Sequence, residues 1–336
     1  MSLTASTKLR GLLEIISAAN EFDNVPIRHH EDVLLRRLQD RLPVKVSSNK
    51  INSPQVKTNL LLQAHFSRFQ LPPDLQSDQH LVLSRVISLL QAAVDVISSN
   101  GWLAPALAAM ELAQMCVQGL WDSDSPLRQI PYFTPDLVKT CAADGVDSVF
   151  ALMGLEDEDR ARLLAGFDAQ QVREVARFCN RYPSIDLSFE VVDSDSLVAG
   201  APVVLKVTLE RESDEDEAAA GAADVGPVIA PYFPLKKDEG WWIVAGNPET
   251  KSLLAIKRFT LQTRLNVKLE FVAPKAGKFA CKLYLMSDSY LGVDQELDVD
   301  LDVAEGEESS DEEEEGEAEA GEEEDGAADE DTQMAE

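Results

Sequence analysis

The sequence is short of basic residues. It carries 30 Lys and Arg against 60 Asp and Glu over 336 residues, which gives a formal net charge of −30. Affinity for nucleic-acid backbones comes from Lys and Arg side chains that displace counterions, and attraction to anionic lipids needs the same side chains. The composition therefore argues against a general binder of nucleic acid and against a protein of membrane surfaces.

Other features are also absent. No apolar run approaches the roughly 18 residues of a transmembrane helix, and residues 1–20 lack the basic and apolar regions of a signal peptide. The cysteines form no CxxC pair and lie apart from histidines at metal-binding spacing, which indicates reduced thiols in a cytosolic or nuclear protein. These cysteines are Cys116, Cys141, Cys179 and Cys281.

Sequence signatures of catalysis are missing too. The chain contains no GxxxxGK[ST], GxGxxG or GxSxG motif and no calcium-binding loop pattern. His29 and His30 are adjacent, and neighbouring positions on a helix point about 100° apart, so they do not readily share one metal ion. We therefore predict no catalytic residue, no metal site and no cofactor, and we interpret the chain as not itself an enzyme.

The acidic residues are concentrated in two tracts. Residues 305–336 hold 18 acids and no Lys or Arg, and residues 212–224 hold six acids and no base. Both tracts lack the apolar side chains that would offset the entropy of ordering them. They predict a disordered tail and a disordered loop, and leave the rest of the chain much closer to neutral.

The remaining chain predicts an α-then-β, multidomain architecture. Apolar residues at helical spacing indicate a helical bundle over residues 1–128. Its most apolar helix, over 103–121, is expected to run through the centre of the bundle, and the helix over 27–42 follows Pro26. Short helices with glycine turns predict a helix–hairpin–helix-like module over 129–183. Alternating strands predict an immunoglobulin- or fibronectin-III-like β-sandwich over 184–304.

Two aromatic clusters are candidates for partner binding. In a strand, consecutive side chains point to opposite faces, so Trp241-Trp242 predicts one ring in the core and one facing solvent or a partner. One interpretation is a core ring beside a partly covered ring, and the other is an interface anchor. Tyr232-Phe233 lies just upstream and belongs to the same candidate patch.

A basic helix face and two serines are further candidates. Arg173, Arg177 and Arg181 recur every four residues, which places them on one helix face. They predict either RNA contact or a solvated face whose arginines pair with neighbouring acids. Ser309-Ser310 precedes Asp311-Glu312, a pattern that suits acid-directed kinases, although an unmodified spacer is the alternative.

Several long stretches of the sequence are distinctive. They are IRHHEDVLLRRL (27–38), NLLLQAHFSRFQLP (59–72), SSNGWLAPALAAMELAQM (98–115), ARFCNRYP (176–183), GPVIAPYFP (226–234), EGWWIV (239–244) and LYLMSDSYLGVDQE (283–296). With them the chain resembles, over about residues 1–304, the C-terminal Sec-sixty-three homology unit of the large spliceosomal DExH-box RNA helicase of the fifth small nuclear ribonucleoprotein. On that resemblance, the chain is expected to be a piece of a much larger protein.

The resemblance implies a nuclear, non-catalytic platform for protein interaction and regulation in pre-mRNA splicing. Its implied partners are the helicase core of the parent chain and other spliceosomal proteins, with weak RNA contact and no membrane. The alternative is an auxiliary RNA-contacting module that supports translocation. In related active helicases a central helix acts as a basic ratchet beneath RNA, and the similar stretch here contains Met110, Gln114 and Gln118 but no Lys or Arg.

Overall fold

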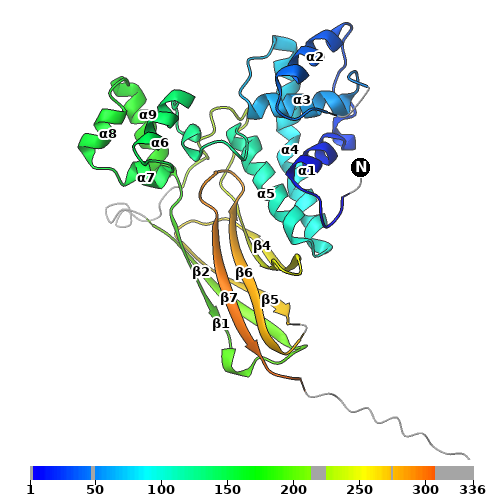
Figure 1. Cartoon of the computed structure of the whole chain (residues 1–336), viewed down its shortest axis with the longest axis vertical. Coiled ribbons are helices and arrows are strands. Elements are labelled where there is room, and N and C mark those ends of the chain that lie inside the picture. The colour runs from blue at the N-terminus through cyan, green and yellow to red at the C-terminus, as the bar shows by residue number, and fades with distance from the viewer. Residues whose placement is uncertain (1–2, 47–49, 213–224, 274, 307–336) are drawn as a thin grey trace, which may run out of the picture.

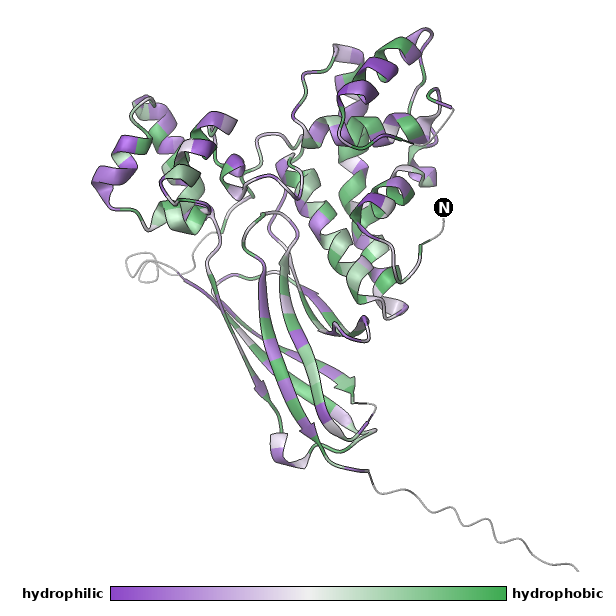
Figure 2. Ribbon diagram, in the orientation of Figure 1, coloured by the Kyte–Doolittle hydropathy of each residue, from purple (hydrophilic) through white to green (hydrophobic). Residues whose placement is uncertain are grey.

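The computed structural model describes residues 3–46, 50–212, 225–273 and 275–306. Figure 1 shows a helical bundle and a smaller helical module side by side, with a β-sandwich extending away from both. The order along the chain is α and then β, as the sequence predicted. Figure 2 shows hydrophobic residues along the bundle helices and an alternation of hydrophobic and hydrophilic residues along the strands.

In the described part of residues 1–128 up to Gln118, the bundle contains helices α1 to α5 and the 3-10 turn η1. Proline at the first helical position starts α3, where the Ser53 hydroxyl accepts a hydrogen bond from the Val56 amide at 3.2 Å. Gly119, in a left-handed conformation at φ +59°, ends α5. The elements are α1 (Leu9–Ser17), η1 (Asn20–Phe22), α2 (Glu31–Arg41), α3 (Pro54–Phe66), α4 (Pro73–Ser99) and α5 (Leu103–Gln118).

One expectation for the bundle needs correction, and another is confirmed. The second helix starts at Glu31 rather than near residue 27, because His30 adopts φ +61°, a left-handed conformation outside the helical range. Helix α5 is buried over most of its length, as expected of a helix in the centre of the bundle. Helix α3 is also buried on all sides from Val56 to Phe66, polar residues included. Because α3 carries several polar side chains, its composition did not predict this burial.

A buried cluster of charges accommodates the polar residues of α3. Lys57 is fully buried, and its Nζ donates to both Glu31 carboxylate oxygens at 2.8 Å and to Asp78 Oδ2 at 2.6 Å. Arg28 also contacts Glu31 and Asp78. Two cations and two carboxylates thus form a balanced network that ties α2, α3 and α4 together.

The smaller module follows the bundle and leads into the sandwich. It contains η2 (Pro126–Gln129), α6 (Pro135–Ala143), α7 (Val149–Met153), α8 (Asp157–Leu163) and α9 (Ala169–Arg181). The strands are β1 (Ile185–Val191), β2 (Pro202–Arg211), β3 (Trp241–Asn247), β4 (Ser252–Phe259), β5 (Arg264–Val272), β6 (Gly277–Ser287) and β7 (Gln295–Val303), with η3 (Ser194–Ser196) after β1.

The strands form two antiparallel sheets. One has the order β1-β2-β5 and the other the order β4-β3-β6-β7. The register places Val207 opposite Phe189 and Val267, so apolar side chains of neighbouring strands share the face inside the sandwich. Whether the sandwich belongs to the immunoglobulin or fibronectin type stays a prediction.

Strand β3 lies between two hydrophobic cores, and this corrects the expectation for the tryptophans. Trp241 is 0% exposed in the core shared by the sandwich and the smaller module, and Trp242 is 2% exposed in the core of the bundle. The alternation of a strand is intact, but the bundle covers the face that was expected to meet solvent or a partner. Neither ring is available as an exposed anchor in this structure.

The β6–β7 loop, residues 288–294, joins the three parts. Gln114 Nε2 of α5 donates to the Ser287 carbonyl at 2.8 Å, at the end of β6, and Gln118 Nε2 donates to the Ser289 carbonyl at 2.8 Å. Gln129 of η2 exchanges two hydrogen bonds with the Leu291 backbone, both at 2.8 Å. These bonds fix the bundle and the module against the same end of the sandwich.

Some predictions remain untested by the fold. The cores cross the predicted boundaries at 128/129 and 183/184, so the division into domains 1–128, 129–183 and 184–304 stays a prediction. Nearly all of the loop 212–224 and the tail 305–336, including Ser309 and Ser310, lies outside the described residues. Their predicted disorder and phosphorylation stay predictions.

Helix α4 is long and apolar enough, by length and composition, to cross a membrane. It packs against α3 and α5, however, and Val82, Val86, Leu90 and Val94 are completely buried between them. Core helices of soluble proteins pass the same test, so this single helix is weak support for a membrane span.

Candidate functional site

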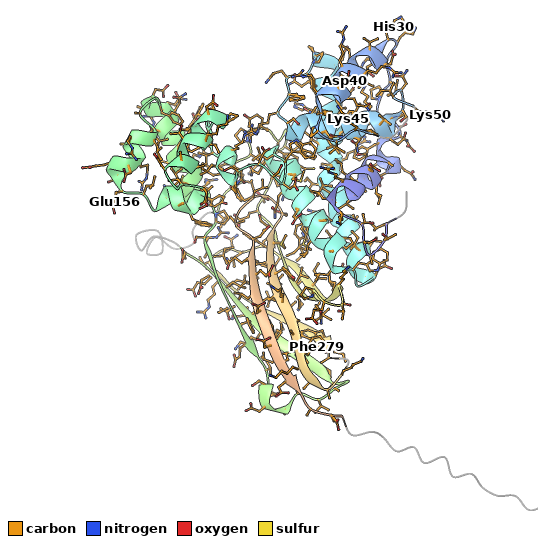
Figure 3. All side chains as sticks on the ribbon, viewed as in Figure 1. His30, Asp40, Lys45, Lys50, Glu156 and Phe279 are labelled. Carbon is orange, nitrogen blue, oxygen red and sulfur yellow. The ribbon has the colours of Figure 1, made fainter. Side chains whose placement is uncertain are left out.

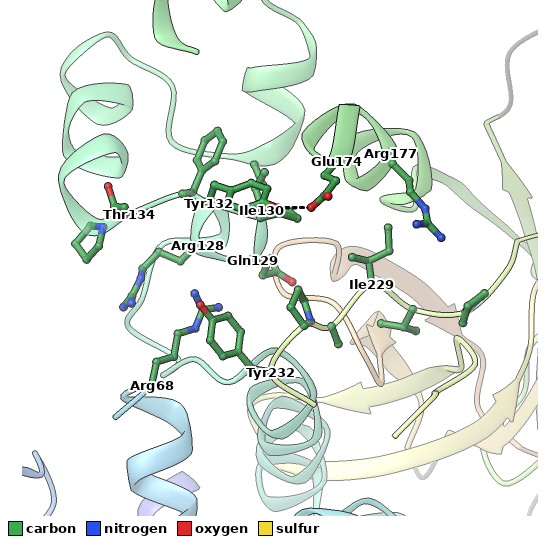
Figure 4. A pocket seen from close by; sticks show the side chains of 17 residues that line it. Arg68, Arg128, Gln129, Ile130, Tyr132, Thr134, Glu174, Arg177, Ile229 and Tyr232 are labelled. Carbon is green, nitrogen blue, oxygen red and sulfur yellow. Dashed lines mark hydrogen bonds between the residues drawn. The ribbon is translucent and has the colours of Figure 1, made fainter. Parts of the chain in front are cut away.

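A pocket of about 720 Å³ opens where the bundle, the smaller module and the segment 226–234 meet. We call it the junction pocket, and Figure 4 shows its lining from close by. Arginines and tyrosines supply its polar groups, and prolines and aliphatic side chains supply most of the rest. Its charged and aromatic lining comprises Arg68, Arg128, Tyr132, Phe133, Glu174, Arg177 and Tyr232.

Arg68 is held rigidly at one end of the junction pocket. It follows α3, and its Nε and Nη2 donate to the Gly119 and Gln118 carbonyls at 2.9 and 3.1 Å. Its guanidinium lies 3.9 Å from the centre of the Tyr232 ring, a cation–π contact. Burial lowers the pKa of Arg68 to about 10, so the side chain is still protonated at neutral pH.

Two more arginines line the junction pocket. Arg128 Nη1 lies 3.1 Å from Asp124 Oδ1, while its buried Nε meets no hydrogen-bond acceptor in the part of the chain that the structure describes. Figure 4 shows Arg68 and Arg128 together on one side and Arg177, from α9, on the other. The pocket therefore has positive charge at both ends.

Tyr132 and Glu174 form the pocket's internal pair. The Tyr132 hydroxyl donates to Glu174 Oε2, and Gln170 Nε2 donates to Glu174 Oε1 at 3.1 Å. The bond from Tyr132 lowers the pKa of Glu174 and raises that of the tyrosine. Glu174 is the one acidic residue among the described residues that line the pocket, and it is already engaged.

The segment 226–234 forms the remaining wall. The Ile229 amide donates to the Tyr290 hydroxyl at 3.0 Å, and Arg181 Nη1 donates to the Pro227 carbonyl at 3.2 Å. A Cβ built on Gly119 would lie 3.1 Å from Tyr232 Cβ, so glycine lets this segment approach the end of α5. His65, beside Gly119, has its pKa lowered to about 4 by burial and adds no charge at neutral pH.

The predicted site residues have different outcomes. The junction pocket brings together Tyr232, predicted for partner binding, and Arg177, predicted for RNA contact. Tyr232 is 48% exposed. Phe233 packs against the core of the bundle, and Arg181 supports the pocket wall. Arg173 is exposed and does not line the pocket. Whether any of them binds a partner or RNA stays a prediction.

The residues of the ratchet-like helix are buried. Met110 is 0% exposed, and Gln114 and Gln118 are 3% and 1% exposed. Both glutamines are used to hold the β6–β7 loop. These three side chains are therefore placed to support the fold and do not present a surface to RNA.

The surface beside α5 is acidic. A second hollow, of about 380 Å³, is lined by Glu111 and Asp122 from the region of α5 and by Asp124 and Asp294. The lining of this hollow contains no Lys or Arg among the described residues. A polyanion would be repelled along this face.

The histidine pair shows no metal-binding arrangement. His30 lies at the outer edge of the bundle, away from the sandwich (Figure 3), and packs edge to face with His29 at 3.8 Å between ring centres. Among the described residues, no group of three or more His, Cys, Asp or Glu side chains could hold a metal ion.

Comparisons with known proteins identify the class. The Sec63 Brl domain family matches residues 1–300, and the chain therefore belongs to this family. The resemblance inferred from the sequence is confirmed.

Particular relatives are large helicases and a splicing factor. The chain is 56% identical over 311 residues to the U5 small nuclear ribonucleoprotein 200 kDa helicase of Homo sapiens, covering 93% of this chain. It is 47% identical over 305 residues to pre-mRNA-splicing factor brr2 of Schizosaccharomyces pombe, and 48% identical over 305 residues to DExH-box ATP-dependent RNA helicase DExH12 of Arabidopsis thaliana, covering 91% and 90% of this chain. The chain spans 14% of the length of each relative.

Proposed function

We propose that this chain is a non-catalytic unit of a nuclear splicing helicase, and that it serves as a platform for protein interaction and regulation. Membership of the Sec63 Brl domain family and the names of the relatives support the splicing context. The junction pocket is the single observation that carries the platform role, because it combines exposed aromatic rings, arginines and an apolar wall. No ATP turnover is expected from the chain alone.

The helicase core of the parent protein is one proposed partner. Val33 and Leu34 on α2 and Val96 on α4 are exposed apolar side chains on the bundle. Contiguous exposed apolar surface is typical of a face that another element covers, and Val33 and Leu34 are consecutive on α2. Other splicing proteins are the second class of partner.

RNA contact is the alternative function. The exposed Arg173 and Arg177 on α9 favour it, while the acidic hollow beside α5 opposes it. A protein platform binds other proteins, whereas an RNA-contacting module binds RNA. A direct measurement of RNA binding therefore distinguishes the two functions.

We expect little binding of a fluorescein-labelled oligouridine at about 0.1 M salt, where charges are screened beyond about 10 Å. Replacing Glu111 and Asp122 together with lysine should create weak, salt-sensitive binding, because the two lysines balance the remaining Asp124 and Asp294 and supply contacts for phosphates. Fluorescence anisotropy at two salt concentrations measures both. Tight wild-type binding that Arg173→Glu and Arg177→Glu both weaken would contradict the platform role and favour the RNA module.

A further inference from the structure

We propose that the junction pocket binds an extended peptide segment of a partner protein in which acidic and apolar side chains alternate. The inference rests on the proposed platform function and deepens it, because it names the surface and the chemistry of the partner. It is carried by the charge, the lining and the rigidity of the pocket.

The charge of the junction pocket is opposite to that of the chain. Three of its lining residues are arginines and one is acidic, in a protein of net charge −30. The acidic residue, Glu174, already accepts hydrogen bonds from Tyr132 and Gln170. Carboxylates of a partner are the complementary groups, because a guanidinium has five N–H donors, of which Arg68 uses two on backbone carbonyls and Arg128 uses one on Asp124.

The donors are held in place before a partner arrives. The backbone carbonyls of Gln118 and Gly119 and the ring of Tyr232 fix Arg68, and Asp124 holds Arg128. The buried Nε of Arg128 has no acceptor among the described residues. A prearranged site loses little conformational entropy on binding.

The lining between the arginines is apolar and suits a polypeptide. Ile130, Pro131, Val228 and Ile229 lie among the lining residues, and the wall from 227 to 231 contains two prolines. A segment whose apolar side chains face this wall can direct its carboxylates to Arg68 and Arg128 at one end and to Arg177 at the other (Figure 4). The pocket therefore selects for both charge and apolar contact.

Single-stranded RNA fits the pocket less well. A polynucleotide carries a phosphate at every residue and would continue over neighbouring surface. Asp124, which binds Arg128, also lines the acidic hollow beside α5. A peptide avoids this repulsion because it can place its acids only where the arginines lie.

The test selects a displayed library of random peptides on the full chain and then measures the binding of the selected peptides as synthetic molecules. We expect Asp or Glu interspersed with apolar residues. Arg177→Glu should weaken binding about tenfold or more, equivalent to about 1.4 kcal/mol. Arg173→Glu is the matched control, because Arg173 is exposed on the same helix and lies outside the pocket. It should bind like wild type.

Four results would overturn the inference. These are failure to select any acidic peptide, unchanged binding when the peptide acids become amides, equal binding to both arginine variants, and binding of an oligouridine that depends on Arg177. A synthetic peptide of residues 307–322, which has no apolar side chain larger than alanine, tests charge alone. Tight binding of this peptide at the pocket would overturn the partner peptide in favour of the chain's own tail.

Failure of the peptide inference is distinguishable from failure of the platform function. If splicing proteins from nuclear extract are retained equally by wild type and Arg177→Glu, the platform stands and the pocket assignment falls. If neither form retains a splicing protein, the platform function itself fails. Circular dichroism melting of both variants checks that the exposed substitutions leave the fold intact.

Discussion

Replacement of Lys57 by methionine is expected to lower the free energy of unfolding by about 3–5 kcal/mol, because two buried carboxylates then share the single charge of Arg28. Lys57 is fully buried and forms ion pairs with Glu31 and Asp78, which also pair with Arg28. Methionine matches the length of the lysine stem, so the loss reflects charge more than volume. Urea denaturation followed by circular dichroism measures it.

Two controls separate charge from packing. Lys139→Met, at an exposed ion pair with Asp136, should change stability by less than about 1 kcal/mol. Lys57→Met combined with Asp78→Asn should recover part of the loss, since the amide removes the unpaired charge. Equal stability of Lys57→Met and wild type would show that the buried network does not hold α2, α3 and α4 together.

The same variant should respond differently to pH. Burial alone would raise the pKa of Asp78, but hydrogen bonds from Arg28 and Lys57 outweigh it and hold the pKa below the ordinary 3.8. A depressed folded pKa gives stability that is complete above the unfolded pKa and is lost as pH falls through the folded pKa. The deficit of Lys57→Met should therefore be largest at neutral pH and shrink in acid, where the carboxylate is neutralised.

Replacement of Trp242 by alanine is expected to destabilise the fold by about 3–5 kcal/mol, as truncation of a buried aromatic ring does. The ring is 2% exposed, between the sheet and the bundle. Tyr232→Ala is the matched aromatic truncation in the junction pocket. Because Tyr232 is 48% exposed, its loss should cost about 1 kcal/mol or less while it removes the stacking of Arg68.

Two measurements on both variants distinguish a structural ring from a partner-binding ring. Urea denaturation gives the stability, and retention of splicing proteins from nuclear extract gives the partner binding. Trp242→Ala should lose stability, and any loss of bound partners should be explained by unfolding. Tyr232→Ala should keep its stability and lose partners. The reverse pattern would restore Trp242 as an interface anchor and remove the junction pocket from the platform.

The periodicity of the sequence was enough to predict the α-then-β order and most of the helices and strands. Alternation along β3 was also correct, but a pattern within one strand does not reveal that a bundle from residues 9–118 covers its second face. The burial of α3 could not be predicted for the same reason. Its Lys57 pairs with Asp78 and Glu31, which lie 21 and 26 residues away in sequence and are not part of any local pattern.

The candidate site was predicted only in pieces. Tyr232 and Arg177 were found because each belongs to a local pattern. Arg68 and Arg128 were missed because nothing near them in sequence marks them, and the pocket joins segments more than 100 residues apart. Gly119, which lets residue 232 approach α5, is a glycine directly after the apolar helix and is a local signal that could have indicated a close approach there.

Cross-linking mass spectrometry of the chain in nuclear extract tests the platform function most directly. Lys236, in the loop after the pocket wall, and Lys139, on the helix that begins at the pocket, are exposed lysines that report on this surface. We predict cross-links from them to splicing proteins, and their loss in Arg177→Glu but not in Arg173→Glu. The platform function would be contradicted by an absence of protein cross-links anywhere on the chain, with RNA cross-linked along α5 and α9 instead.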